Sequence, residues 1–461
     1  MRFPEGVQMI LRYLLLPDIL ELVEANRLND VREFLAKQPA PEITELLEAV
    51  DDKARVLLFR VLPRALADEV FSLLEPPFQE LLLRNMQQDE VKATLSGLTP
   101  DDRTALFEEL PARVVQRLLA LLPDKDRKQA LVLLSYPENS VGRLMTDRYV
   151  TVKPEWTVEQ ALAHLRAVGM DSETMSMIYI VDDAGKLKDD LRLRKLILSP
   201  PLTKVAHLLD GNYAVLQSLQ DREEAVQIFK DYDLFALPVV DSDGILIGIV
   251  TVDDILDVAE EEATEDFHKM ASVSSLEVSL KDATIGLLFR KRIGWLLGLV
   301  IVNVFTAMGI RGFEATISKL AALVCFMPLL IGSGGNAGSQ AATLLVRAMA
   351  TGDIDAKDWW RLFLRSMGGS VLIGTVMAAA IAVMATLMLV GTPNRFQIVG
   401  VVAASMFAIV LMGSLIGTLL PMLLERLHLD PATASAPLIS SVSDILGILI
   451  YFSIATTVMG F

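Results

Sequence analysis

The sequence predicts a multidomain fold: an all-α superhelical N domain, an α/β tandem pair, an acidic connecting helix and a five-helix transmembrane domain. Three observations support this fold class. Short leucine-rich helical patterns separated by prolines fill the first part of the chain, a strand-rich pattern then occurs twice, and five long uncharged or nearly uncharged stretches follow. The expected domains are residues 1–135, 136–200, 201–257, 258–278 and 279–461.

The composition divides the chain into two unlike halves. Of its 461 residues 52% are hydrophobic, and the mean hydropathy of +0.44 is too high for an ordinary soluble protein. From residue 276 onward there are 12 basic and 9 acidic residues, whereas the residues before it contain 30 and 49. This acidity argues against nucleic-acid binding, which needs basic surfaces, and it suits divalent cations. The single cysteine, Cys325, excludes an intrachain disulfide. The apolar stretch 9–16 is short and lacks a small-residue cleavage site, so we expect no signal peptide.

Residues 1–135 contain helix after short helix, and one fragment recurs. Segments 58–63 and 106–111 both have the pattern Leu-Phe-x-x-Leu-Pro, and each follows a pair of aspartates, Asp51-Asp52 and Asp101-Asp102. A recurring helical unit predicts stacked helical hairpins in a superhelix. A plain helical bundle is the alternative.

Residues 136–257 contain an internal duplication. The strand-like runs 177–181 and 236–240 are each preceded by an amphipathic helix and followed by an Asp/Gly turn, a second strand and a helix. This arrangement resembles a tandem pair of CBS domains, and the second copy, at 237–241 and 248–254, matches better than the first.

An acidic stretch without Gly or Pro follows the second copy. Eight acids occur in the 14 residues from Asp253 to Asp266, and four of them, at positions 254, 257, 261 and 265, fall on one face of a predicted helix. A solvated helix or partial disorder is the simpler interpretation. Its place directly before a membrane domain favours a functional one.

Five stretches are long enough to span a bilayer. Four contain no charge, 293–310, 320–346, 366–394 and 396–424, and the fifth, 431–461, contains only Asp444. The basic cluster 290–292 precedes the first span, and Arg347, Lys357, Arg361 and Arg365 lie around the loop between the second and third spans. Basic residues favour the cytoplasmic side, so we expect the N-terminal half in the cytoplasm and the C-terminus outside.

Two features inside the spans carry chemistry. Four glycines in the seven residues 332–338 predict either an interrupted helix beside a pore or close glycine-rich packing. Asp444 is the only acid or base in the last 31 residues. A carboxylate at membrane depth costs at least a few kcal/mol, so it usually faces a bundle interior or a water-filled path. One buried acid without a buried base indicates a path for cations, with an internal hydrogen bond to a neighbouring serine as the alternative.

The order of these parts resembles the MgtE family of bacterial magnesium channels over nearly the whole chain. The most specific matches are 335–340 with Thr343 and Arg347, 430–432 leading to 444–447, and 263–269, which is similar to the plug helix of the family. The resemblance implies a homodimer in the lipid of the cell inner membrane, with a Mg²⁺ pore along the dimer axis between the second and fifth spans. It implies as pore-lining residues Gly335, Asn336, Ser339, Thr343 and Asp444, the last also as an ion ligand.

The resemblance also implies that cytosolic Mg²⁺ is regulatory as well as transported, and that it closes the pore by bridging acids of the N, CBS and plug regions. A ligand that prefers the closed state shifts the population toward that state. The implied bridging acids are Asp221, Glu223, Asp233, Asp254, Asp257, Glu262, Glu265 and Asp266, with Asp101 and Asp102 from the N domain.

One departure from the family concerns ATP. Relatives that bind ATP use an acid and an aromatic residue of the first CBS copy, where this chain has Lys195 and Met177. Arg194 and Lys195 offer positive charge to a phosphate, but the two replacements predict weak or absent ATP binding.

Other functions fit the residues less well. An intramembrane metalloprotease needs His-Glu-x-x-His within a span, and His164, His207, His268 and His428 show no such spacing, so we expect no enzyme. Transport of Co²⁺, Mn²⁺ or Ni²⁺ stays open, although no cluster of His, Cys or Met surrounds Asp444. A metal sensor that its spans merely anchor would leave Asp444 unexplained.

Overall fold

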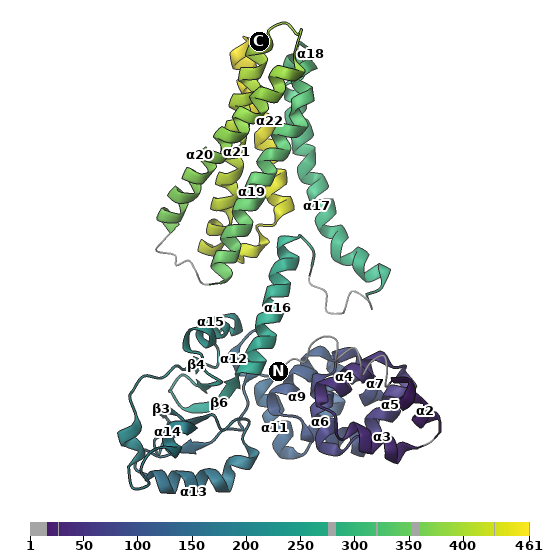
Figure 1. The fold of residues 1–461 in the computed structure, drawn as a ribbon, viewed down its shortest axis with the longest axis vertical. Coiled ribbons are helices and arrows are strands. Elements are labelled where there is room, and N and C mark those ends of the chain that lie inside the picture. The colour runs from purple at the N-terminus through teal and green to yellow at the C-terminus, as the bar shows by residue number, and fades with distance from the viewer. Residues whose placement is uncertain are drawn as a thin grey trace. The chain divides into compact units, whose positions relative to one another are not determined.

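The computed structural model describes residues 16–25, 27–274, 283–319, 321–351, 359–427 and 429–460 (Figure 1). The chain divides into two compact units, residues 1–258 and 259–461. Several residues used in the sequence analysis lie outside the described ranges, namely 9–15, 275–278, Lys357 and His428.

The first unit begins with short helices that stack in two rows. Helices two apart in the chain pack side by side, α4 on α6, α6 on α8 and α8 on α10, and likewise α3 on α5, α5 on α7 and α9 on α11. This stacking supports helical hairpins over a plain bundle, and it confirms the helical N domain. The helices are α2 (Leu16–Glu24), α3 (Leu28–Leu35), α4 (Ala40–Ala49), α5 (Asp52–Val61), α6 (Arg64–Leu73), α7 (Pro76–Asn85), α8 (Gln88–Gly97), α9 (Pro100–Glu109), α10 (Ala112–Leu121) and α11 (Asp124–Leu133).

A repeated hydrogen bond joins consecutive helices of this domain. Arg55, Gln79 and Arg103 each occupy the fourth position of their helix, and each donates to the backbone carbonyl eight residues earlier, that of Leu47, Phe71 and Leu95 respectively. All three side chains are buried. Because the last carbonyls of a helix have no partner within it, these side chains satisfy the end of one helix from the start of the next.

The α/β pair confirms the internal duplication. In the first copy β1 (Thr151–Val152) pairs in parallel with β2 (Met177–Val181), which pairs antiparallel with β3 (Leu187–Arg192). In the second copy β4 (Leu216–Gln217), β5 (Ala236–Val240) and β6 (Leu246–Thr251) repeat the order. The predicted strands 177–181 and 236–240 are observed with these bounds. The helices of the pair are α12 (Val141–Leu144), α13 (Val158–Val168), η2 (Gly169–Asp171), α14 (Leu193–Ile197), η3 (Val205–Leu208) and α15 (Arg222–Tyr232).

The two copies also share their turn geometry. Gly185 and Gly244, the last residues of the two predicted Asp/Gly turns, have φ angles of 81° and 80°. This left-handed region favours glycine, which explains why both turns end in that residue.

The acidic segment is a single helix, α16 (Val252–Met270), which begins directly after β6. The expected domain boundary at residue 258 therefore falls inside a continuous helix. No glycine or proline interrupts it, in agreement with the helical spacing of its acids.

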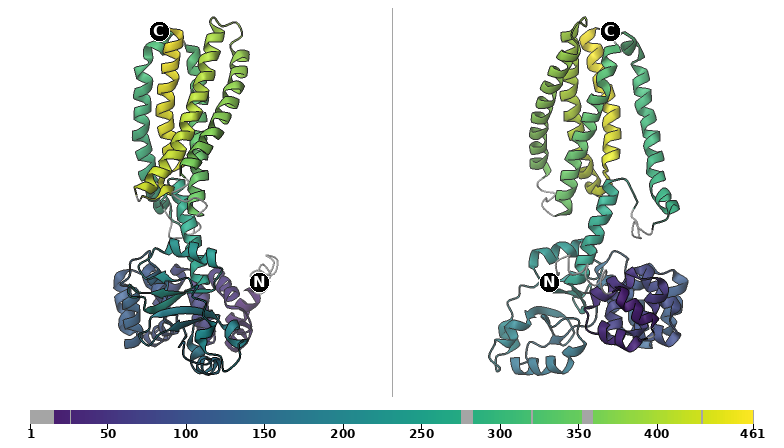
Figure 2. Two further views of the ribbon diagram at one scale, coloured as in Figure 1. Left: turned by 90° about the vertical axis from the view of Figure 1, so that its left-hand side faces the viewer. Right: turned by 45° about the vertical axis from the view of Figure 1, so that its right-hand side comes forward.

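Among its described residues, the second unit contains five helices that are long and apolar enough to cross a membrane. They are α17 (Ile285–Gly312), α19 (Met327–Ala350), α20 (Trp359–Met388), α21 (Arg395–Arg426) and α22 (Ala436–Met459), with the short α18 (Glu314–Lys319), η4 (Ala321–Phe326) and η6 (Pro431–Thr433) between them. Helices α19, α21 and α22 pack against one another, while α20 packs on α21 and α17 on α22 (Figure 2). The five-helix membrane domain is thus confirmed.

The glycine-rich part of the second span does not interrupt its helix, so the expectation of irregular backbone there was wrong. Helix α19 is continuous over 327–350. A Cβ atom on Gly413 would lie 2.2 Å from the carbonyl oxygen of Gly334, and one on Gly417 would lie 2.0 Å from that of Gly338. The glycines therefore allow the backbones of α19 and α21 to touch, and this packing outweighs the low helix propensity of glycine.

Candidate functional site

Asp444 lies in the first half of α22, a helix that is otherwise uncharged. Its side chain is half-buried, and it forms no hydrogen bond or ion pair with any residue in the described part of the chain. The alternative of an internal hydrogen bond to a serine is therefore not observed. The hydroxyl of the adjacent Ser443 is buried and also has no partner among the described residues.

Asp444 belongs to the seam between α22 and α19. One turn earlier on the same face, the Ser440 hydroxyl lies 3.4 Å from that of Ser339 on α19. Ser339 also donates to the Ala436 carbonyl at 3.3 Å. A Cβ on Gly335 would lie 3.1 Å from the Ser440 hydroxyl, so Gly335 is a position of close approach between the two helices.

The other predicted pore residues lie on an uncovered face of α19. Asn336 and Thr343 are exposed, seven residues apart, and the exposed Gln340 lies between them. Polar side chains at membrane depth need cover from protein or from a water-filled cavity. Of the predicted set, Asn336 and Thr343 are thus free to line a path, whereas Gly335 and Ser339 join α19 to α22.

A second group of acids lies within the first unit, where the start of α9 and the start of α16 bring Asp101 and Asp254 into electrostatic contact. Burial, with the neighbouring Asp102 carboxylate as a further cause, raises the pKa of Asp101 to about 7. Burial likewise raises the pKa of Asp254, and the Asp101 carboxylate adds to the effect. One oxygen of Asp101 is buried without a hydrogen-bond partner among the described residues. The Thr251 hydroxyl donates to Asp254 at 2.5 Å.

Two further acids belong to this group. Burial raises the pKa of Glu173, and Asp102 and Asp253 raise it further, while Arg148 lowers it. Glu173 is an isolated acid in a loop and belongs to no sequence pattern that predicts a site, and Asp253 was predicted only as part of the acidic run. Within the described residues, no three acidic, histidine or cysteine side chains are arranged to hold a metal ion.

The acids predicted around α15 have local structural roles. The Asp221 side chain caps the helix by accepting a hydrogen bond from the Glu223 amide at 2.9 Å. Asp233 ends the helix in a left-handed conformation with φ of 50°. Their positions at the ends of a helix are explained without an ion.

A third group of charges lies in the second unit, at the end of α16. The Lys269 ammonium is 2.5 Å from the Glu265 carboxylate and 2.6 Å from that of Asp430, which precedes η6. Burial raises the pKa of Asp266, and Asp430 raises it further. Two predicted acids, Glu265 and Asp266, thus lie near an acid of the α21–α22 connection.

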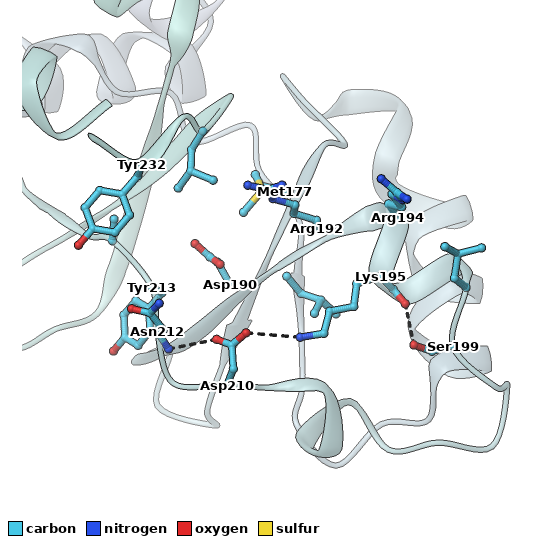
Figure 3. A pocket seen from close by; sticks show the side chains of 14 residues that line it. Met177, Asp190, Arg192, Arg194, Lys195, Ser199, Asp210, Asn212, Tyr213 and Tyr232 are labelled. Atoms are coloured by element: carbon cyan, nitrogen blue, oxygen red, sulfur yellow. Dashed lines mark hydrogen bonds and ion pairs between the residues drawn. The ribbon is translucent and has the colours of Figure 1, made fainter. Parts of the chain in front are cut away.

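The α/β pair contains a cavity of about 630 Å³ (Figure 3). Arg194 and Lys195 line one side, and Tyr213 and Tyr232 lie on the other. The Lys195 ammonium is 3.5 Å from the Asp210 carboxylate. The cavity therefore offers positive charge and aromatic rings, but the lysine predicted to oppose ATP binding is already paired with an acid.

Asp190 adds a negative charge to the same cavity. Burial raises its pKa to about 6, with Asp189 and Asp210 as further causes, and one of its oxygens has no hydrogen-bond partner in the described residues. An ionised Asp190 would repel a phosphate and would accept a hydrogen bond from a ligand donor.

Comparison with protein families gives matches along most of the chain. Residues 327–454 match the family MgtE, described as a divalent cation transporter. Residues 38–139 match the MgtE intracellular N domain, and residues 141–197 and 206–261 match the CBS domain.

Individual relatives cover the chain nearly from end to end. The magnesium transporter MgtE of Thermus thermophilus is 37% identical over 439 residues, which cover 94% of this chain and 96% of that protein. The magnesium transporter MgtE of Bacillus subtilis is 31% identical over 438 residues, covering 95% and 96%.

Two solved structures resemble the N-terminal half. The cytosolic domain of the Mg²⁺ channel MgtE in complex with ATP is 35% identical, with a TM-score of 0.51 and coverage of 53% of this chain and 100% of that one. The soluble part of a magnesium transporter is 28% identical, with a TM-score of 0.51 and coverage of 54% and 98%.

Proposed function

The chain belongs to the MgtE family of divalent cation transporters, and on this premise we propose that it conducts Mg²⁺ across the cell inner membrane. The observation that carries the proposal is Asp444, a carboxylate in an apolar helix without a partner among the described residues. A carboxylate at that depth needs compensation, and a passing cation supplies it. Mg²⁺ dehydrates reluctantly, so a carboxylate can hold it through water without a complete protein cage.

The proposed transporter is a homodimer. One carboxylate per chain makes a poor ring, and a second copy supplies its partner across a twofold axis. The uncovered polar face of α19, with Asn336 and Thr343, is the face that such an axis would cover. Asp444 would hold the hydrated ion, and Gly335 and Ser339 would keep α19 and α22 close enough to shape the path.

Gating is proposed to depend on Mg²⁺ in the cytosol. Asp101 and Asp254 suit a divalent ion, because their carboxylates lie in electrostatic contact with each other and are partly buried. No lysine or arginine among the described residues forms an ion pair with either of them. An ion there would neutralise the repulsion and stabilise the closed arrangement. The remaining acids, Asp102, Asp221, Glu223, Asp233, Asp257, Glu262, Glu265 and Asp266, are proposed as further or weaker contributors.

The chain is a multi-pass membrane protein, and we propose that its N-terminal unit is cytoplasmic and its C-terminus outside. The basic cluster at the start of α17 and the five spans support this orientation. Lipid would cover the apolar outer faces of α17 and α20, and no catalytic activity is proposed.

ATP is proposed to bind weakly or not at all, although a relative's cytosolic domain has been solved with ATP. Lys195 and Met177 line the cavity where ATP-binding relatives have an acid and a ring, and Asp190 places a negative charge there. We expect titration calorimetry to show no ATP affinity better than about 0.1 mM, a weak interaction by the usual scale. Micromolar binding would show that the replacements are harmless.

The central test is cation flux into proteoliposomes, with Mg²⁺, Ca²⁺, Mn²⁺ and Co²⁺ compared side by side. We expect Mg²⁺ to be carried well, because the path offers only oxygen ligands that suit a hard ion. Co²⁺ or Mn²⁺ carried in preference to Mg²⁺ would favour the rival function of a transporter for other divalent cations.

The Asp444→Asn variant tests the residue that carries the proposal. Its isosteric amide removes the charge without changing the packing, so Mg²⁺ flux is expected to fall at least about tenfold while the protein stays folded. Glu314→Gln, at the start of α18 and outside the five long helices, is the matched control and should retain flux. Full transport by a well-folded Asp444→Asn protein would refute the assignment of the path.

A further inference from the structure

The last turn of α16 is attached to the connection between α21 and α22 by contacts that need no added ion. The Lys269 ammonium contacts Glu265 at 2.5 Å on its own helix and Asp430 at 2.6 Å on the connection. All three side chains are partly covered, with exposed fractions of 32%, 39% and 35%. A lysine thus occupies the place between two acids where a bound cation would otherwise be needed.

Asp430 is held in place independently of Lys269. One of its carboxylate oxygens accepts a hydrogen bond from the Ala432 amide at 2.8 Å, which caps the short η6. The other oxygen faces Lys269. Because the cap fixes the carboxylate, the ion pair joins the helix to a rigid point and not to a mobile side chain.

A second contact lies one turn beyond. The Ser272 hydroxyl donates to the Ser435 hydroxyl at 2.6 Å, and both side chains are buried. Ser272 has φ of 57°, a left-handed conformation that residues other than glycine rarely adopt. The chain therefore turns sharply at the point where it meets the start of α22.

The charges around Lys269 do not balance without it. Glu265, Asp266 and Asp430 are three acids on the two facing segments, and Asp430 acts on Asp266 electrostatically. Without the lysine these acids would repel, and a cation from solution would be needed to bring the segments together.

We propose that Lys269 is a positioning residue, which holds the end of α16 against the α21–α22 connection in the absence of bound divalent cations. Its ammonium substitutes for an ion at Glu265 and Asp430, so this contact persists when Mg²⁺ is low. The inference rests on the proposed gating only for what the contact does to transport; the contact itself is independent of it.

The test uses disulfide formation in the full-length chain. Ser272→Cys and Ser435→Cys are combined in a Cys325→Ala background, which removes the natural thiol. Diamide oxidises the two thiols to a disulfide and is itself reduced to a hydrazine, so no metal catalyst is needed and EDTA can be present. The parent is expected to cross-link in EDTA at a rate that Mg²⁺ raises less than about twofold.

Lys269→Met in the same background is expected to cross-link at least about fivefold more slowly in EDTA, with Mg²⁺ restoring the rate. Lys269→Arg, which keeps the charge, should behave like the parent. Arg426→Gln is the charge-matched control, because the substitution removes one positive charge from the end of α21. Arg426 itself forms no ion pair with a described residue.

Two results would overturn the inference: a Lys269→Met chain that cross-links in EDTA as fast as the parent, or a Lys269→Arg chain that fails to restore the rate. Mg²⁺ flux through the same proteins separates the two proposals. If flux ignores cytosolic Mg²⁺ while the cross-linking pattern holds, the gating proposal fails and the role of Lys269 stands.

Discussion

The acids at the two ends of α16 differ in how their charge is compensated. At its start, Asp254 lies near Asp101, burial raises the pKa of both, and neither forms an ion pair with a described lysine or arginine. At its end, Glu265 and Asp430 share the ammonium of Lys269. The acids at the start of α16 therefore need a proton or a cation from solution to compensate their charge, whereas the acids at its end are compensated by the Lys269 ammonium.

Because of this difference, we expect the acids at the two ends of α16 to have different functions. A site with uncompensated charge responds strongly to the concentration of a divalent ion, because binding removes repulsion that nothing else removes. A site that contains a lysine changes little when the ion arrives, since the ion must first displace the ammonium. Ion sensing is thus expected to depend on Asp101 and Asp254, and attachment on Lys269.

The largest expected effect is a difference in Mg²⁺ inhibition between variants at the two ends of α16. Asp101→Asn with Asp254→Asn should raise the cytosolic Mg²⁺ concentration that half-inhibits flux by at least about tenfold, because the uncompensated carboxylates are the responsive ligands. Glu265→Gln with Asp430→Asn should shift it by less than about threefold. Flux into proteoliposomes at graded cytosolic Mg²⁺ gives both values.

Equal shifts from the two double variants would show that the two ends of α16 respond alike to Mg²⁺. Unchanged inhibition in both would show that the acids of α16 form only a solvated surface. Limited proteolysis of the 257–274 region, with and without millimolar Mg²⁺, gives an independent measure of the same response.

The next effect is a pH dependence of stability from Asp101. The unfolded chain releases this proton near the ordinary value of 3.8, whereas the folded chain holds it up to about pH 7. The folded state therefore binds more protons between these values, and the free energy of unfolding falls as pH rises from about 4 to 7. Asp101→Asn should remove this loss and raise the melting temperature at pH 8 by about 5 °C.

Circular dichroism of the detergent-solubilised protein at pH 4 and pH 8 measures this effect. The variant should match the parent at pH 4, where the folded parent is already protonated. Glu69→Gln, an exposed acid of α6, serves as the control and should show no such pH-dependent gain. A destabilised Asp101→Asn protein at pH 8 would contradict the account of the first group of acids.

The smallest effect concerns salt. Lys269 and its partners are partly exposed, so raising NaCl from 50 to 500 mM in EDTA should weaken their attraction, because the screening length falls below about 10 Å. Hydrogen exchange of residues 259–270 should then become about twofold faster. The gain in stability from Asp101→Asn should hardly change, since that residue is buried. Salt-independent exchange of residues 259–270, together with a salt-dependent gain in stability from Asp101→Asn, would contradict this account of the two ends of α16.

Local patterns predicted much of the fold. The strands 177–181 and 236–240 were predicted with their observed bounds, because short apolar runs before Asp/Gly turns leave few alternatives. The acidic helix and the five membrane helices followed from residue spacing and from length. The expectation of an interrupted helix in the glycine-rich span was wrong. This helix depends on close packing against the backbone of α21, which the local sequence does not show.

Residue patterns along the chain predicted the type and order of the parts and singled out Asp444, because a charge within an apolar stretch is visible without any structure. Only the tertiary structure showed that Asp101 and Asp254 meet, that Glu173 joins them, and that Lys269 links Glu265 to Asp430. The reason is physical: secondary structure and membrane insertion depend on neighbours along the chain, whereas the compensation of a charge depends on what packing brings near it in space.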